Sequence, residues 1–129
     1  MDDKTFGQLV TKGIEAIPEP FRSKIENVAF LIEDEPSSEE RKESHLTPNQ
    51  TLLGLYRGIP QTRRGIHYHA ALPDRITIFK KPILGLSNDP KTIKQIVANT
   101  VWHEVGHHFG LNEQEIRKRE RERRNTEDS

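Results

Sequence analysis

Hydrophobic residues recur at helical spacing near the start of the chain. They follow a candidate N-cap at Thr5 and stop before Pro18 and Pro20, which end a helix. The apolar positions of this first predicted helix are Phe6, Leu9, Val10, Ile14 and Ile17. The pattern indicates an amphipathic helix with one face turned to a core.

A second, longer helix is predicted from Pro90 to Gly110. Asn88 or Asp89 precedes it as N-cap, and proline suits the first helical position. Gly110 can take the left-handed conformation that favours a helix C-terminus. One face carries apolar side chains four residues apart, namely Ile93, Val97, Val101, Val105 and Phe109.

Short runs of β-branched and aromatic residues predict three or four strands between the two helices. Residues 27–33 form the uninterrupted apolar run of a buried strand. The other candidates are residues 51–57, 75–80 and 66–70, the last with Tyr68 as its only aromatic residue. Together with the helices these strands indicate a small α+β unit.

Two polar segments interrupt this pattern. Residues 33–50 have the composition of a solvated loop, long enough to be mobile or to act as a lid. Residues 112–129 carry six acidic and six basic side chains, with Ile116 as their only large apolar residue. We therefore predict a core of residues 1–111, followed by a charged C-terminal helical extension or tail (residues 112–129) that contributes nothing to the core.

The composition narrows the class of protein. The 129 residues contain 20 basic and 20 acidic side chains, which argues against a dedicated nucleic-acid or membrane-surface binder. There is no cysteine, so any metal must be held by His, Asp or Glu. The N-terminus lacks a signal-peptide pattern, and no apolar run approaches the roughly 18 residues of a membrane span. These features predict a cytoplasmic protein without a membrane partner.

The second helix carries a His-Glu-x-x-His motif at residues 103–107. Residues four apart on a helix project from the same face, so His103 and His107 can reach one zinc ion. Glu104 lies beside them and can take a proton from water. The motif continues through Gly110 to Glu113, where a chain reversal would return a third ligand to the metal.

These residues resemble those of the small zincin-like metallopeptidases found in bacteria. The stretches that carry the resemblance are residues 27–28 leading to 33–36, then 52–60, 72–79 and 103–110. The family implies an α+β, minimal zincin-like fold, in which a small mixed sheet of three or four strands packs on two main helices and the second helix carries zinc.

The same resemblance implies roles for individual residues. His103 and His107 would be metal ligands for Zn²⁺, Glu104 the general base, and Glu113 the third ligand. The family usually has aspartate at the last position, so Glu113 departs from the pattern by one methylene group. The implied activity is a zinc metallopeptidase that hydrolyses peptide bonds in a peptide or a flexible protein segment.

Several interpretations stay open from the sequence. On residue type alone, the oxyanion formed in hydrolysis could be stabilised by Tyr56, His67, Tyr68 or His108. A zinc-stabilised binding or regulatory module with little turnover is the alternative to an enzyme. The basic side chains of residues 117–124 could touch RNA, but the interleaved acids favour a solvated, ion-paired helix.

Individual residues near the motif also carry expectations. His108 is expected to contact solvent or to support the metal site without binding the metal. His67 and His69 alternate, so on a strand they would share one face, either as a second metal site or as exposed residues. A glycine inside a helix, such as Gly106, lowers helix stability by about 1 kcal/mol relative to alanine. Close approach of the sheet or a ligand to the backbone would be a reason for glycine at this position. Trp102 and Phe109 are expected in the core.

Overall fold

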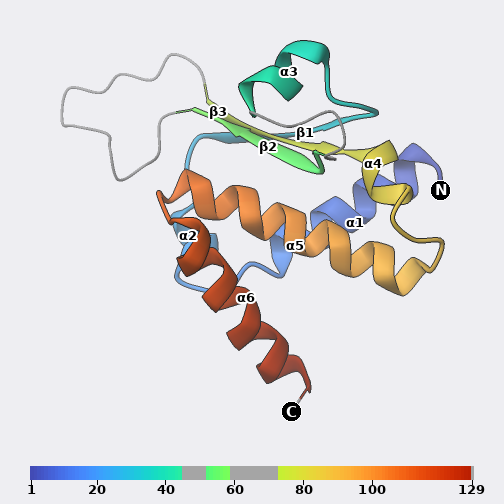
Figure 1. Cartoon of the computed structure of the whole chain (residues 1–129). Helices are drawn as coiled ribbons and strands as arrows, with labels where there is room; N and C mark the ends of the chain where they lie inside the picture. The colour runs from blue at the N-terminus through green and yellow to red at the C-terminus, as the bar shows by residue number, and fades with distance from the viewer. Residues whose placement is uncertain (45–51, 59–72, 129) are drawn as a thin grey trace.

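The computed structural model describes residues 1–44, 52–58 and 73–128. Within them, three strands form one mixed sheet in the order β1-β3-β2 (Figure 1). β1 (Val28–Glu33) runs parallel to the central strand β3 (Asp74–Phe79), and β2 (Gly54–Arg57) runs antiparallel to it. The α+β class with a small mixed sheet is therefore confirmed.

Helices lie on both sides of this sheet. α1 and α5 pack together beneath it in the view of Figure 1, and α3 lies above it. α6 leaves the end of α5 and points away from the sheet. The helices are α1 (Asp3–Glu15), α2 (Phe21–Lys24), α3 (Ser38–Glu43), α4 (Lys80–Leu84), α5 (Pro90–His108) and α6 (Glu113–Asp128).

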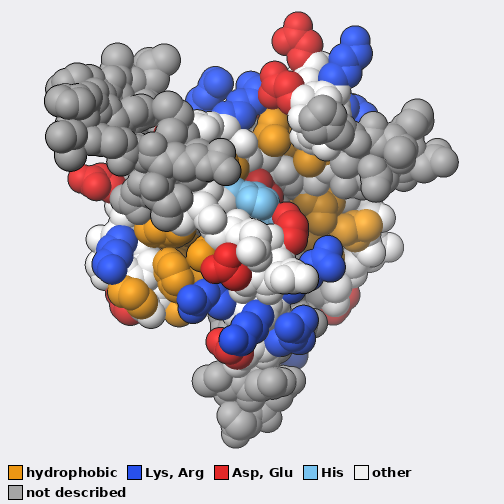
Figure 2. All heavy atoms as spheres, turned by 60° about the vertical axis from the view of Figure 1, so that its left-hand side comes forward, with side chains coloured by type: hydrophobic (Ala, Val, Ile, Leu, Met, Phe, Trp, Pro, Cys, Tyr) orange, Lys and Arg blue, Asp and Glu red, His pale blue; other side chains and the backbone are white. Residues whose placement is uncertain are grey.

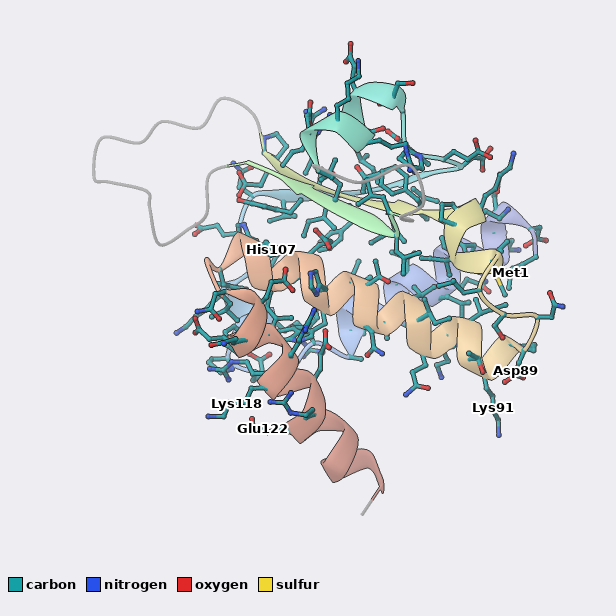
Figure 3. The ribbon with its side chains drawn as sticks, in the orientation of Figure 1. Met1, Asp89, Lys91, His107, Lys118 and Glu122 are labelled. Atoms are coloured by element: carbon teal, nitrogen blue, oxygen red, sulfur yellow. The ribbon has the colours of Figure 1, made fainter. Side chains whose placement is uncertain are left out.

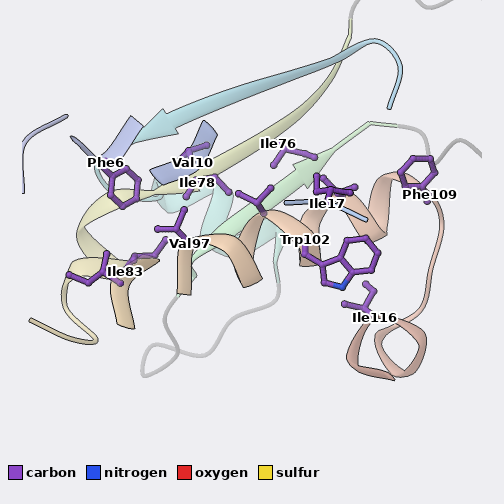
Figure 4. Close-up of a cluster of buried hydrophobic side chains, with 13 residues drawn as sticks. Phe6, Val10, Ile17, Ile76, Ile78, Ile83, Val97, Trp102, Phe109 and Ile116 are labelled. Carbon is purple, nitrogen blue, oxygen red and sulfur yellow. The ribbon is translucent and has the colours of Figure 1, made fainter. Parts of the chain in front are cut away.

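The hydrophobic core lies between the sheet and the helix pair (Figure 4). Both predicted amphipathic helices contribute to it, and Trp102 and Phe109 belong to it as expected. Among the described residues, the hydrophobic side chains at 0% exposure are Phe6, Ile76, Ile78, Phe79, Ile83, Val97, Val101 and Ile116. The prediction that the C-terminal segment contributes nothing to the core is wrong for Ile116, because α6 folds back against α5 before it leaves the domain.

The predicted helix termini are largely as expected. α5 starts at Pro90 with Asp89 as its N-cap, and Figure 3 shows Asp89 and His107 near opposite ends of this helix. In α1 the cap is Asp2 rather than Thr5, because the Asp2 carboxylate accepts a hydrogen bond from the Thr5 backbone N–H. α4 was not predicted; Pro82 lies in its first turn, where a missing N–H costs no helical hydrogen bond.

β1 is not the buried strand that its apolar run predicted. It lies at the edge of the described sheet, and Leu31 and Ile32 are 40% and 42% exposed. β3 is instead the central strand, and its last four residues, Ile76-Thr77-Ile78-Phe79, are all buried. An apolar run alone does not distinguish a central from an edge strand, because strand order depends on tertiary pairing.

The polar segment at residues 33–50 is not a plain loop where it is described. It contains α3, which begins with a capping box: the Ser37 hydroxyl accepts from the Glu40 N–H, and the Glu40 carboxylate accepts from the Ser37 N–H. Arg57 on β2 contacts Glu43 at 2.9 Å and holds this helix near the sheet. The predicted strand at residues 66–70, with His67, Tyr68 and His69, lies outside the described residues, as does the rest of the predicted lid.

Replacing Ser37 by alanine should lower the free energy of unfolding by about 1 kcal/mol, because the first turn of α3 loses its cap. Urea unfolding followed by circular dichroism measures this loss. Ser38→Ala is the matched control, since Ser38 is exposed and lies within the helix. Equal unfolding midpoints for the two variants would contradict the role of the capping box.

Candidate metal centre

The last two turns of α5 present two parallel stripes of polar side chains. His103 and His107 form one stripe, and Glu104 and His108 form the other, each pair being one helical turn apart. The first stripe is partly exposed, whereas Glu104 is 8% and His108 0% exposed. The helix therefore directs His103 and His107 towards the surface. Glu104 and His108 are buried.

The chain reverses sharply after this helix. Gly110 has φ 76°, its N–H donates to the His107 carbonyl, and the Leu111 N–H donates to the Gly106 carbonyl. This pair of hydrogen bonds is a Schellman motif, which needs a left-handed residue at the position of Gly110. The predicted end of the helix is thus confirmed, and the next helix begins only three residues later with Glu113.

This reversal places Glu113 against the two partly exposed histidines, His103 and His107. Its Oε1 lies 3.1 Å from His103 Nε2 and 3.2 Å from His107 Nε2. Two ligand atoms about 2.0–2.1 Å from one tetrahedral zinc ion lie about 3.3 Å apart. The two histidine nitrogens and the Glu113 oxygen therefore have the spacing and the chemistry of a zinc-ligand set. Glu113 reaches both histidines although its side chain is one methylene group longer than the family's usual aspartate.

Glu104 also lies close to the two histidines, but in a different environment. One ligand atom from each of His103, Glu104 and His107 falls within 4.8 Å of the others. The Glu104 carboxylate accepts a hydrogen bond from the Tyr56 backbone N–H of β2. Burial raises the pKa of Glu104 to about 7. A carboxylate with this pKa can accept a proton near neutral pH and release it again.

The same surroundings favour a neutral His107. Burial lowers the pKa of His107, and the neighbouring His103 lowers it further. A neutral imidazole has the free electron pair that a metal ligand requires.

Two adjoining hollows flank this cluster. A cavity of about 610 Å³ lies against it, with Tyr56, His103, Glu104, His107 and Glu113 among its lining residues. A second cavity of about 430 Å³ extends along α5 and is largely apolar, lined by Leu52, Leu53, Leu86 and Ile96 beside His103 and Glu104. Figure 2 shows histidine side chain at the centre of this face with acidic side chains around it.

A buried polar network lies behind the cluster. Asp74 Oδ2 accepts a hydrogen bond from the Tyr56 hydroxyl at 2.7 Å and contacts His108 Nδ1 at 2.9 Å. Two of the four residues considered for oxyanion stabilisation, Tyr56 and His108, are thus engaged with Asp74. The other two, His67 and Tyr68, lie outside the described residues. Of the two alternatives expected for His108, contact with solvent is wrong, because its side chain is fully buried, and support of the metal site stays a prediction.

α6 is docked by packing at Gly106. A Cβ built on Gly106 would lie 2.7 Å from Ile116 Cγ1, so only glycine lets α6 approach this closely. The expected close approach is therefore present, but it comes from α6 rather than from the sheet or a ligand. Arg119 adds a contact over the Phe21 ring, 4.9 Å from its centroid. In Figure 4, Ile116 reaches from α6 towards Trp102.

Sequence reasoning missed three residues near the cluster. Glu120 lies 4.0 Å from His103 Nδ1, and its spacing of seven residues from Glu113 was a signal for the same helix face. Gly54 lets β2 approach α5, since a Cβ there would meet Thr100 Cγ2 at 2.8 Å. Asp74 had no signal beyond its place in a stretch that resembles the family.

A small α+β fold with His-Glu-x-x-His on a helix beneath a mixed sheet defines the class of zincin-like proteins. A family model for zincin-like metallopeptidases matches residues 25–123. The chain belongs to the zincin-like metallopeptidase family, which confirms the resemblance seen in the sequence.

The fold is similar to that of a solved structure. A conserved hypothetical protein from Thermus thermophilus is similar with a TM-score of 0.55 and 22% identity, over 84% of this chain and 94% of that one. At this identity the similarity shows a shared fold alone. A search among curated proteins found no match. Among the described residues, no helix is long and apolar enough to span a membrane.

Proposed function

We propose that this protein is a zinc-dependent metallopeptidase that cleaves peptides or flexible protein segments. His103, His107 and Glu113 would hold the zinc ion, and Glu104 would act as general base. The observation that carries the proposal is the placement of one Glu113 oxygen within 3.1 and 3.2 Å of two histidine nitrogens, beside a buried glutamate. A zinc site that serves structure alone has no need of such a buried carboxylate next to its ligands.

The chain's own residues account for the proton transfers. Zinc, when bound, supplies Lewis-acid chemistry that polarises a carbonyl oxygen and acidifies water. Glu104 takes the proton of the attacking water on its carboxylate and returns it to the departing amine nitrogen. Burial against β2 holds this carboxylate in place, and in the metal-free chain burial raises its pKa to about 7.

β2 offers the surface along which a substrate would lie. The antiparallel ladder alternates, and the Phe79 N–H donates to the Leu53 carbonyl, so the backbone of Leu53 and Leu55 faces β3. The carbonyls of Gly54 and Tyr56 therefore face away from β3, at an edge of the described sheet. An extended peptide can add to such an edge through main-chain hydrogen bonds, next to Glu104.

The test combines metal content with hydrolysis. Elemental analysis of the full chain after zinc loading and dialysis should give one zinc ion per chain, and a mixed peptide library should be cleaved by this form. Loss of cleavage after chelation and its return on adding zinc support the proposal. Zinc binding without cleavage of any peptide would instead assign the chain to the zinc-stabilised binding modules.

Replacing Glu113 by alanine should weaken zinc binding by about 100-fold or more, because loss of a partner that merely orients a ligand already costs 10–100-fold. Competition with a chromophoric chelator measures this affinity. Glu122→Ala on an exposed part of α6 is the matched control and should bind zinc as the natural chain does. An unchanged affinity in Glu113→Ala would remove Glu113 from the ligand set.

A further inference from the structure

The second stripe of α5 is bound to the sheet at two points. Glu104 accepts the backbone N–H of Tyr56, and His108, one turn further on, contacts Asp74 at 2.9 Å. Asp74 in turn accepts a hydrogen bond from the Tyr56 hydroxyl at 2.7 Å. These contacts form a closed ring. It joins Glu104 and His108, one turn apart on α5, then Asp74, then the Tyr56 side chain. The Tyr56 backbone N–H completes the ring at Glu104.

Asp74 is the centre of this ring. It is the first residue of β3 and is 2% exposed. One of its carboxylate oxygens meets both partners, and a carboxylate has no proton to donate, so Tyr56 and His108 must both donate to it. Asp74 therefore fixes the direction of the Tyr56 hydroxyl and makes Nδ1 the protonated nitrogen of His108.

The end of β2 is closed around the same carboxylate. A Cβ built on Gly58 would lie 2.4 Å from Asp74 Cγ and Oδ1, and Gly58 has φ 155°. Only glycine permits this approach, which packs the backbone after Tyr56 against the buried carboxyl group. The hydroxyl of Tyr56 and the backbone at Gly58 are thus two separate contacts between Asp74 and the end of β2.

The backbone N–H of Tyr56 donates a hydrogen bond to Glu104 on α5. Tyr56 lies opposite Ile76 in the ladder, at a position whose backbone N–H points away from β3. The ladder positions Tyr56 within the sheet, whereas the distance from its N–H to α5 depends on contacts between the strands and the helix. The bonds from the Tyr56 hydroxyl to Asp74 and from Asp74 to His108 are two such contacts next to Glu104.

We propose that Asp74 is a positioning residue, which acts through Tyr56 and His108 to hold the β2 edge against α5 and thereby orients the Glu104 carboxylate. Its catalytic consequence rests on the proposed function above, whereas the positioning itself does not. A buried network that served stability alone would contribute to the unfolding free energy without acting selectively on Glu104.

Amide hydrogen exchange tests the positioning without any substrate. In the full chain at equal zinc content, the Tyr56 amide should be protected through its hydrogen bond to Glu104, although it points away from β3. Tyr56→Phe, which removes only the hydroxyl, should raise exchange at position 56 about tenfold relative to Leu55 in the same molecule, as expected for the loss of one hydrogen bond. Asp74→Asn and Glu104→Ala should raise the same ratio.

The Leu55 amide is an internal reference, because it faces β3 and reports the general stability of the sheet. Val10→Ala is the matched control: Val10 is 4% exposed and lies on α1, which contributes no residue to the ring. This variant should raise exchange at both amides and leave their ratio unchanged. A ratio in Tyr56→Phe equal to that of the natural chain would overturn the proposal.

Kinetics test the catalytic consequence. For a peptide that the natural chain cleaves, Tyr56→Phe should lower kcat about tenfold, while KM and the zinc content stay unchanged. Val10→Ala should keep the natural kcat at temperatures where it is folded. Natural kcat in Tyr56→Phe would refute the catalytic part. If the natural chain cleaves nothing, the proposed function fails, and the exchange ratio still decides the positioning.

Discussion

Replacing Glu104 by glutamine should reduce peptide hydrolysis by about 10²–10⁴-fold, the usual contribution of a positioned general base. Zinc content should stay at the natural value, because His103, His107 and Glu113 are untouched. Glutamine keeps the length of the side chain and an oxygen that can accept the Tyr56 N–H, so the fold around it is preserved. It cannot take a proton from water at neutral pH.

The experiment compares initial rates at saturating peptide, with zinc per chain measured on the same samples. Glu122→Gln makes the same chemical change on an exposed part of α6 and should cleave at the natural rate. A Glu104→Gln variant with full activity and normal zinc would exclude Glu104 as the base. Loss of both activity and zinc would show instead that Glu104 is a metal ligand. Its carboxylate is close enough for that role, because one ligand atom from each of His103, Glu104 and His107 lies within 4.8 Å of the others.

Replacing Ile116 by alanine should have the largest effect on stability and a second effect on zinc. Ile116 is fully buried, and truncation of a buried isoleucine to alanine typically costs about 2–5 kcal/mol. Its side chain packs on Gly106 and docks α6 against α5. Because α6 carries Glu113, we expect zinc to bind more weakly although Ile116 cannot bind metal.

Ile83→Ala separates the two effects. Ile83 is also fully buried, but it lies on α4, and Figure 4 shows it at the other end of the core from Ile116. Both variants should lose comparable unfolding free energy in urea, and only Ile116→Ala should lose zinc affinity at a temperature where both are folded. Equal zinc affinities in the two variants would show that the docking of α6 does not control Glu113.

Much of the site was predictable from sequence because it depends on local spacing. The four-residue interval between His103 and His107 places both on one helix face whatever the rest of the fold does. Gly110 marks the end of the helix, since few other residues take φ 76° without strain. From these local rules alone, a short reversal that returns Glu113 to the histidines could be expected, and the structure places Glu113 beside both.

Other features depended on contacts between distant segments and could not be predicted. The apolar run of residues 27–33 was expected to be buried, but strand order puts it at an edge of the described sheet. Ile116 stands alone in a charged sequence, and its burial follows from the space that Gly106 leaves on another helix. The capping box of α3 was readable in Ser37 and Glu40, but the surrounding polar composition indicated a loop.

By itself the sequence determined the two main helices, the family and the residue types gathered at the candidate metal centre, because helical periodicity and motif spacing are set by backbone geometry within a few residues. The tertiary structure alone decided how Asp74, Tyr56 and His108 meet, since they come from β3, β2 and α5. Their meeting requires two strands to pair and a helix to pack across them. Such contacts leave no periodic signal along the chain, because the three residues lie on separate elements that meet only in the folded protein.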